Sequence, residues 1–397
     1  MAGRRLVLVI VSMGVLASAC AAVPKPQASG IGTSVTVGAG PTTTSPSATS
    51  PTAPPTTASP TTAPTSPPPA PASGPGMVGG AGFSEPVLFW DSNADLSRQL
   101  DGIATTGARW LRIDVSWAMI EGNQGSYDWS APDRIVAAAS ARGLSMLGEL
   151  DFTPAWARPA GTTQIYPPTN PQDFAGFAAA AVRHFGAGIR SWEIWNEPNS
   201  PVFWGGGANP AAYVQLLNPA YDAIKAIDPG ATVLTGGTAP GANGGGWIAP
   251  LDFLSGIYAA GGGGHFDAVA HHPYNWPFMP MRPEPYNYNY NAFAGVTPRL
   301  HDLMASKGDG AKRIWGTEMG APVPTVRQGQ TTDNTYLAQY VTEAFSAWRQ
   351  WAWTGPLMWY SYRDRGTNAG DPEQVFGLVT RDYTPKAIDA FTAAVKG

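Results

Sequence analysis

Between residues 78 and 397, short apolar segments alternate eight times with stretches of helical pattern. Strands are predicted at residues 77–83, 109–115, 145–150, 191–196, 232–235, 266–271, 313–317 and 356–361. A helix is predicted after each, at residues 96–105, 132–142, 171–184, 210–227, 251–260, 296–306, 335–351 and 385–395. Continuous apolar strands each followed by a helix are typical of a parallel sheet covered on both faces. Eight such units in about 320 residues favour a closed (β/α)8 TIM barrel over an open doubly wound sheet.

The first 19 residues have the pattern of an export signal. Arg4 and Arg5 precede an apolar run at residues 6–16, and the small residues Ala17-Ser18-Ala19 follow it. The run is too short for a membrane-spanning helix, which needs about 18 or more apolar residues. Because the sequence contains no other such run, the mature protein is expected to have no transmembrane helix.

Cys20 is the only cysteine of the chain and directly follows this predicted signal. Its position resembles a bacterial lipobox, although Leu16 lies one place earlier than that motif usually requires. The resemblance implies that Cys20 is lipidated and tethers the protein to the outer face of the cell membrane. The alternative is ordinary signal cleavage that leaves a free N-terminal cysteine and a secreted protein. Either alternative predicts an exported protein.

Residues 20–77 form a segment of different composition, rich in Pro, Thr, Ser, Ala and Gly. The part from 24 to 75 has almost no aliphatic or aromatic side chains to bury, so burial cannot offset the entropy lost on ordering. This segment is predicted to be a disordered, semi-extended linker. Residues 78–397 then form one catalytic domain.

The charge of the chain limits its partners. Loss of residues 1–19 removes Arg4 and Arg5 and no acid, so the formal net charge of −4 becomes −6. A mildly acidic protein is a poor candidate for nucleic-acid binding and is compatible with a neutral sugar polymer as substrate. The Gly-rich stretches contain no G-x-G-x-x-G between a strand and a helix, so no nucleotide site and no cofactor are expected.

Two predicted strands end on a glutamate. The segment 191–196 runs into Asn196, Glu197 and Pro198, and the segment Ile314-Trp315-Gly316-Thr317 runs into Glu318. The carboxyl ends of barrel strands are where enzymes of this architecture hold their reactive groups. A pair of carboxyl groups, one protonated and one ionised, suits cleavage of an acetal. An arginine beneath the ionised group would keep it charged, and an asparagine beside the acid could bind a sugar hydroxyl.

These segments resemble the clan A retaining glycoside hydrolases of the family 39 and family 5 type. The similar segments are Glu193-Ile194-Trp195-Asn196-Glu197-Pro198-Asn199, the Glu318 strand, the stretch from Trp110 to Trp117, Thr153-Pro154-Ala155-Trp156-Ala157, His272-Pro273-Tyr274 and the stretch from Trp359 to Asp364. The resemblance implies that Glu197 is the acid/base and Glu318 the nucleophile. It also implies substrate contacts from Arg112, Asn196, His272, Tyr274 and Trp359.

Two further residues are candidate substrate contacts from the sequence. Trp204, on a loop after the fourth strand, could stack on a sugar ring, as could the tyrosines at 286, 288 and 290. Asp151 and Glu149 place two acids at the end of the third strand, where members of these families more often carry less charge. Both features lie where substrate would sit, so the sugar cannot be transferred from the family.

Each candidate also has a structural interpretation. Arg112 could form an ion pair with Asp114 or Glu149, and Tyr274 and Trp359 could be packing residues. His271 is expected to be a core residue. Glu193 is expected to be structural, on the face of its strand opposite Asn196. His271, His272 and Asp267 lack a third histidine nearby, so no metal site is expected.

The function predicted is that of a glycosidase hydrolysing O-glycosyl bonds of a cell-wall or extracellular polysaccharide, as a monomer. A transglycosylase that remodels glycans would use the same two glutamates. A non-catalytic carbohydrate-binding barrel is the alternative from another class. The sugar, its linkage, and endo against exo action remain open, with xylosides, glucans, mannans and furanose polymers such as galactan all compatible.

Overall fold

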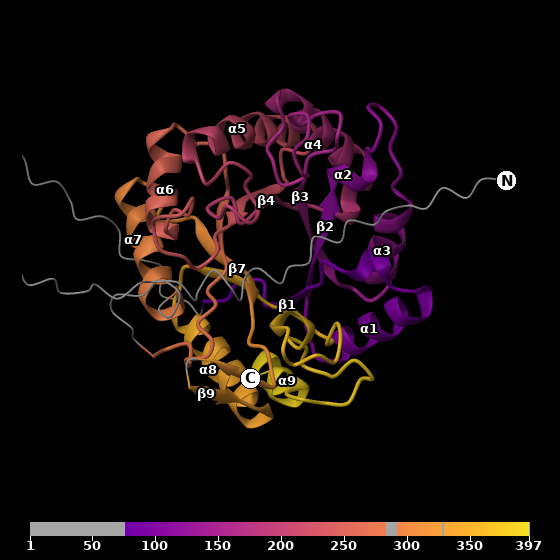
Figure 1. The fold of residues 1–397 in the computed structure, drawn as a ribbon, viewed down its shortest axis with the longest axis vertical. Helices are drawn as coiled ribbons and strands as arrows, with labels where there is room; N and C mark the ends of the chain where they lie inside the picture. The colour runs from indigo at the N-terminus through magenta and orange to yellow at the C-terminus, as the bar shows by residue number, and fades with distance from the viewer. Residues whose placement is uncertain (1–75, 283–291, 328, 397) are drawn as a thin grey trace, which may run out of the picture. The chain divides into compact units, whose positions relative to one another are not determined.

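The computed structural model describes residues 76–282, 292–327 and 329–396 (Figure 1). The predicted signal, Cys20, nearly all of the predicted linker and the tyrosines at 286, 288 and 290 lie outside these residues. Within the described ranges, none of the helices has both the length and the apolar character needed to cross a membrane.

Eight strands form a closed barrel in which every neighbouring pair is parallel. Going round the barrel from β1, they are β1 (Ala81–Ser84), β2 (Trp110–Ser116), β3 (Ser145–Asp151), β4 (Ser191–Asn196), β5 (Thr232–Gly237), β6 (Ala268–His271), β7 (Arg313–Met319) and β10 (Thr354–Trp359). The predicted (β/α)8 barrel is therefore confirmed. Because all strands run the same way, their carboxyl ends meet at one mouth of the barrel.

Helices cover the outside of the barrel (Figure 1). The main ones are α1 (Asn93–Thr105), α3 (Ser130–Ser140), α4 (Pro171–Phe185), α5 (Pro210–Ile227), α6 (Pro250–Ala259), α7 (Thr297–Ser306), α8 (Asn334–Gln350) and α9 (Ile388–Lys396). Several begin at a side-chain cap: Ser92, Asn170, Asn209 and Asp333 each accept a hydrogen bond from a backbone N–H of the first turn.

Several short elements were not predicted from the sequence, among them one helix and one hairpin. The four-residue helix α2 (Trp117–Ile120) follows β2 directly, and β8 (Thr325–Arg327) pairs with β9 (Gln330–Thr332) as a short antiparallel hairpin after β7. Both are too short to produce a periodic apolar pattern. The first barrel strand also begins later than predicted, at Ala81, because Gly79 and Gly80 have positive φ angles of 98° and 93°.

Apolar side chains fill the barrel in two layers. The larger cluster lies between the strands and the helices and includes Trp192, Ile194 and Trp195 of β4. A smaller cluster on the inner face is formed by Leu147, Leu234, Ala268, Ala270, Trp315 and Met358. Nearer the carboxyl ends of β3 and β7 the buried residues are the acids Glu149 and Glu318. The sequence therefore places charge on the inner face where the barrel mouth begins.

The end of β4 departs from regular alternation at Trp195, whose φ angle is +72°. Ile194 and Trp195 both pack in the outer cluster, and the Trp195 Nε1 donates a hydrogen bond to the backbone oxygen of Phe203 over 2.7 Å. Glu193 and Asn196 consequently both reach Arg112. The prediction that Glu193 faces away from Asn196 was wrong, because a left-handed residue between them shifts the alternation by one position.

Gly236 of β5 makes this irregular end of β4 possible, because a Cβ there would lie 2.5 Å from the Trp195 carbonyl oxygen and 2.7 Å from that of Ile194. We expect Gly236→Ala to lower the free energy of unfolding by about 1–3 kcal/mol or more, as overpacking does. Gly176→Ala is the matched control, since Gly176 is exposed within α4 and its Cβ would meet no atom within 4 Å. This change should raise stability by about 0.5–1 kcal/mol. Urea unfolding followed by tryptophan fluorescence measures both, and equal effects would contradict this role of Gly236.

Candidate active site

Arg112 of β2 is the centre of the site and is 1% exposed. Its guanidinium group donates four hydrogen bonds, to Glu193 Oε2 at 2.7 Å from Nε, to Glu318 Oε1 at 2.6 Å and Ser84 Oγ at 3.1 Å from Nη1, and to Asn196 Oδ1 at 3.2 Å from Nη2. Nη2 also forms an ion pair with Glu149 Oε1 at 2.7 Å, so the partners come from β1, β3, β4 and β7. A structural ion pair with Asp114 or Glu149 therefore does not account for all contacts of Arg112, since Arg112 also binds the predicted nucleophile.

Glu318, near the end of β7, is held at both oxygens. Arg112 binds Oε1, and the Tyr274 hydroxyl donates a hydrogen bond to Oε2 over 2.9 Å. Burial, followed by the negative charge of Glu318, raises the pKa of Tyr274 well above its usual value, so this phenol remains a neutral donor. Two donors thus fix the orientation of the carboxylate and stabilise its charge.

Glu197 comes directly after β4 and is 2% exposed. Burial, and next the charge of Glu318, raises its pKa well above the usual value for a glutamate. Its Oε1 lies 2.9 Å from His272 Nδ1, whereas Oε2 has no hydrogen-bond partner among the described residues. Burial and the charge of Glu318 therefore favour the protonated form of Glu197, and its Oε2 makes no hydrogen bond to another described residue.

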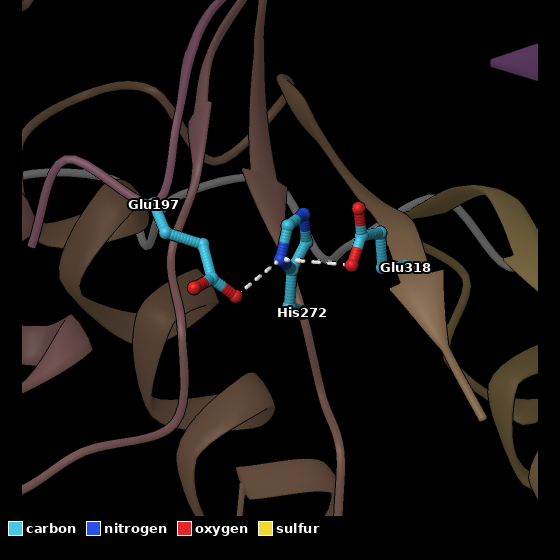
Figure 2. A group of neighbouring side chains, drawn as sticks. All are labelled: Glu197, His272 and Glu318. Carbon is cyan, nitrogen blue, oxygen red and sulfur yellow. Dashed lines mark hydrogen bonds and ion pairs between the residues drawn. The ribbon is translucent and has the colours of Figure 1, made fainter. Parts of the chain in front are cut away.

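His272 lies between the two glutamates (Figure 2). Its Nδ1 is 2.9 Å from Glu197 Oε1 and 3.6 Å from Glu318 Oε2. Burial, and next the charge of Arg112, lowers the pKa of His272 well below its usual value, so the ring is neutral. Gly237 leaves the space that the ring occupies, since a Cβ there would lie 2.2 Å from His272 Nε2.

The two carboxyl groups are therefore close but chemically different. One atom from each of Glu197, His272 and Glu318 lies within 4.8 Å of the others. Carboxyl pairs about 5–5.5 Å apart suit attack by one carboxylate on the anomeric carbon, whereas about 6.5–9.5 Å leaves room for a water molecule. A protonated Glu197 facing an Arg112-bound Glu318 has the arrangement needed for an acid and a nucleophile.

The eighth strand places a different aromatic residue at the site from the one predicted. Trp359 is fully buried, and its ring packs edge-on against Tyr340 of α8 with centroids 6.1 Å apart. Met358 takes the inner face instead, because successive strand residues alternate. The predicted sugar contact of Trp359 is therefore not supported, and its ring belongs to the outer core.

Tyr360 is a residue of the site that the sequence analysis included in the stretch from Trp359 to Asp364 without assigning it a role. Its ring lies edge-on to that of Tyr274, with centroids 6.4 Å apart, and its hydroxyl donates a hydrogen bond to Glu373 Oε2 over 2.8 Å. Burial raises the pKa of Glu373 to about 7, while Arg365 and Tyr360 oppose that rise. The sequence signal for Tyr360 was the aromatic run that continues after Trp359. Because successive residues point to opposite faces, the residue after the outward-facing Trp359 points to the barrel mouth.

Trp204 also lies away from any position where it could bind substrate. It is 2% exposed, and its ring is packed against Trp195 and Tyr213, with centroids 5.4 and 5.8 Å away. Both of its neighbours belong to the outer core, so no face of the indole is open to a sugar. The prediction that Trp204 stacks on substrate was wrong, because the loop after β4 folds back onto the helix layer.

Asp151 is at the barrel mouth as predicted, in a group with Asp114 and Glu149 whose oxygen atoms lie within 4.8 Å of one another. Burial is the main cause that raises the pKa of each, to about 6 for Asp114. Among the described residues, His271 and Asp267 join no such group, and His271 is buried as expected, with its Nδ1 2.9 Å from the Thr238 hydroxyl.

No family model matches the chain. A β-xylosidase of Geobacillus stearothermophilus is 30% identical over 116 residues, which are 26% of this chain and 23% of that protein. The chain thus spans about a quarter of this curated relative.

Among solved structures, a family 39 glycoside hydrolase of Bacteroides cellulosilyticus aligns with a TM-score of 0.66 at 24% identity, over 80% of this chain and 64% of that one. GH5_18 of Streptomyces cattleya, solved with GlcNAc, gives 0.59 at 18% identity, over 80% and 79% of the two chains. The predicted likeness to families 39 and 5 is confirmed as a likeness of fold.

The buried network around Arg112 generates a prediction about stability. We expect Arg112→Gln to lower the free energy of unfolding by about 3–5 kcal/mol at pH 7, because buried carboxylates lose their counter-charge. The loss should shrink toward pH 4.5. Burial already raises the pKa of Glu149 and Glu193, removal of Arg112 raises it further, and such a group costs stability only above its unfolded-state pKa of about 4.3.

Urea unfolding at pH 7 and at pH 5 measures this difference. The control is Arg190→Gln, since Arg190 pairs with Asp228 at the surface, where its side chain is 58% exposed. That variant should show no pH-dependent loss. An Arg112→Gln protein with the same deficit at both pH values would contradict the charge-based account.

Proposed function

We propose that the protein is a retaining glycoside hydrolase that cleaves β-type O-glycosidic bonds of a cell-wall or extracellular polysaccharide. The observation that supports this proposal best is the pairing of Glu197 with Glu318 across His272, in environments that leave one protonated and the other bound to Arg112. Double displacement requires such a pair of carboxyl groups, one protonated as the acid and one ionised as the nucleophile.

In the first step, a Glu318 oxygen attacks the anomeric carbon of the sugar. Glu197 donates its proton to the glycosidic oxygen, the bond between that oxygen and the anomeric carbon breaks, and the leaving sugar departs as an alcohol. A glycosyl ester of Glu318 remains. The Tyr274 hydroxyl and the Arg112 guanidinium, each on one oxygen of Glu318, set the angle of attack before the sugar arrives.

In the second step, Glu197 acts as the base. The ester has no negative charge, so one of the causes that raised the pKa of Glu197 is gone, and the carboxylate can accept a proton from water. The water oxygen attacks the anomeric carbon, and the bond to Glu318 breaks. Arg112 then stabilises the carboxylate that is released, and the sugar keeps its original configuration.

β-Xylosides are the first substrates to test, because the curated relative is named a β-xylosidase. The match to that protein is short, so β-glucosides, β-mannosides and β-galactofuranosides belong in the same panel. The polysaccharide itself is proposed only as a class. A transglycosylase would form the same ester and pass it to a second sugar instead of water.

The nucleophile assignment predicts an outcome for two matched variants. With an activated aryl β-glycoside, Glu318→Ala should lower kcat by more than about 10³-fold, because the covalent route is lost. Glu197→Ala should form a β-glycosyl azide when azide is added, since azide can attack the ester without a base. If Glu318→Ala forms a glycosyl azide at all, that product should be the α-anomer. Product anomers are identified by NMR.

Turnover that survives in Glu318→Ala would contradict the mechanism. Wild type that binds glycans without any turnover would favour the carbohydrate-binding barrel, and longer oligosaccharides as the main product would favour the transglycosylase.

We also propose that the protein is exported and lipidated at Cys20, as the lipobox-like segment ending at that residue suggests. Expression in a bacterial host grown with an alkyne fatty acid should give a labelled protein in the membrane fraction. The isosteric variant Cys20→Ser should lose the label and appear in the medium. Absence of the label from the wild type would support ordinary signal cleavage instead, and label that persists in Cys20→Ser would contradict lipidation at Cys20.

A further inference from the structure

The barrel mouth contains a second group of oxygen atoms beside the two glutamates. Asp114 and Ser116 lie two residues apart on β2, and Glu149 and Asp151 lie two apart on β3. In the parallel pairing, Asp114 is opposite Glu149 and Ser116 is opposite Asp151. Alternation directs all four side chains to the inner face, because Val115 and Leu150 between them belong to the outer core.

Several of these atoms are buried without a partner. Ser116, Glu149 and Asp151 are 3%, 2% and 1% exposed. Among the described residues, the Ser116 Oγ and both carboxylate oxygens of Asp151 have no hydrogen-bond partner. A buried polar group without a partner is costly, and a buried charge more so. The unpartnered hydroxyl is not part of the acidic cluster, so it is a separate indication that something binds here.

The charges nearby do not balance. Arg112 offers one positive charge and already contacts Glu149, Glu193 and Glu318. Asp114 and Asp151 add two more carboxyl groups beside it, within 4.8 Å of Glu149. The carboxyl groups therefore outnumber the positive charge of Arg112, and a further cation here would reduce that imbalance.

We propose that Asp114, Glu149 and Asp151, with Ser116, bind a hard divalent cation, for which Ca²⁺ is the best match. The donors are all oxygen atoms, as Ca²⁺ prefers, and one oxygen from each of the three carboxyl groups lies within 4.8 Å of the others. The Asp151 oxygens have almost no accessible surface, so a sugar ring cannot reach them. A small ion can. The site is separate from Glu197, His272 and Glu318, and it revises the expectation that the chain binds no metal.

Shared protons are the competing explanation for the same cluster. Asp114, Glu149 and Asp151 face Arg112 of the same sheet, Glu193 of β4, Glu318 of β7 and Arg365, and burial favours their neutral forms. Because carboxyl groups must lose protons to bind a metal, Ca²⁺ should bind more tightly at pH 7.5 than at pH 5.5. Proton sharing alone gives no response to Ca²⁺ at either pH.

The test uses the full chain, treated with a chelator and then dialysed against CaCl₂. Elemental analysis should find one Ca²⁺ per chain at pH 7.5, and the unfolding temperature should rise by about 5 °C at saturating Ca²⁺. Asp151→Asn should lose both the metal and the shift, and Ser116→Ala, which retains the carboxylates, should weaken binding several-fold. Asp302→Asn, an exposed residue of α7, is the control and should behave as wild type.

Wild type that retains no stoichiometric Ca²⁺, Mg²⁺ or Mn²⁺ and shows no thermal shift would overturn the proposal. So would an Asp151→Asn protein that still binds one Ca²⁺ with the wild-type shift. If Asp151→Asn does not fold, Ser116→Ala decides through a Ca²⁺ titration of the thermal shift, and a midpoint equal to that of the wild type would overturn the proposal. Neither measurement depends on glycosidase activity, so failure of this site and failure of the proposed function are distinguishable.

Discussion

The ion pair between Arg112 and Glu193 is the interaction on which the rest of the barrel mouth depends. Both side chains are buried, and removing two charges from water costs several kcal/mol per ion unless every donor and acceptor is satisfied. Glu193 meets that condition: its other oxygen accepts hydrogen bonds from the Gly237 N–H over 2.8 Å and the Thr317 hydroxyl over 3.1 Å. The pair therefore connects β2, β4, β5 and β7. A structural glutamate fixes the positions of the strands that carry Glu197 and Glu318.

This arrangement places the two glutamates of one site in different electrostatic environments. Glu318 faces a cation and a phenol, which both stabilise a negative charge. Glu197 has a buried position and a negatively charged neighbour, Glu318, and both disfavour its ionisation. The two environments differ because the strand that carries Glu318 ends next to Arg112. This difference does not require any property of the glutamates themselves.

The sequence predicted this fold well because the signal was periodic and local. The bounds predicted for β4 and for α5 agree with those observed, since each is a continuous apolar or amphipathic run that ends at a residue unable to extend it. The two strand-end glutamates were found for the same reason. The sequence interpretation failed where one backbone angle decides a direction: the positive φ at Trp195 brings Glu193 to Arg112, and no residue pattern shows it.

Aromatic residues were harder to place than charged ones. Trp359, Tyr360 and Trp204 all lie in or after apolar strands, and either a core position or a sugar contact is compatible with such a sequence. Strand alternation and loop packing decide between the two, and both are set by non-local contacts, as with Tyr340 of α8 behind Trp359. Charged residues are better constrained, because a buried charge must have a partner.

The same constraint bears on the acids of β3. A barrel could hold Glu149 with Arg112 alone, yet this chain adds Asp114 and Asp151 within 4.8 Å, and besides burial the charge of Asp114 raises the pKa of both Glu149 and Asp151. During double displacement Glu318 alternates between a carboxylate and a neutral ester, so the charge beside Arg112 changes by one unit in every cycle. Protons shared among the acids would move in response. A bound divalent cation would hold the surrounding charge fixed, so that the change at Glu318 acts on Glu197 and is not dissipated in the neighbouring carboxyl groups.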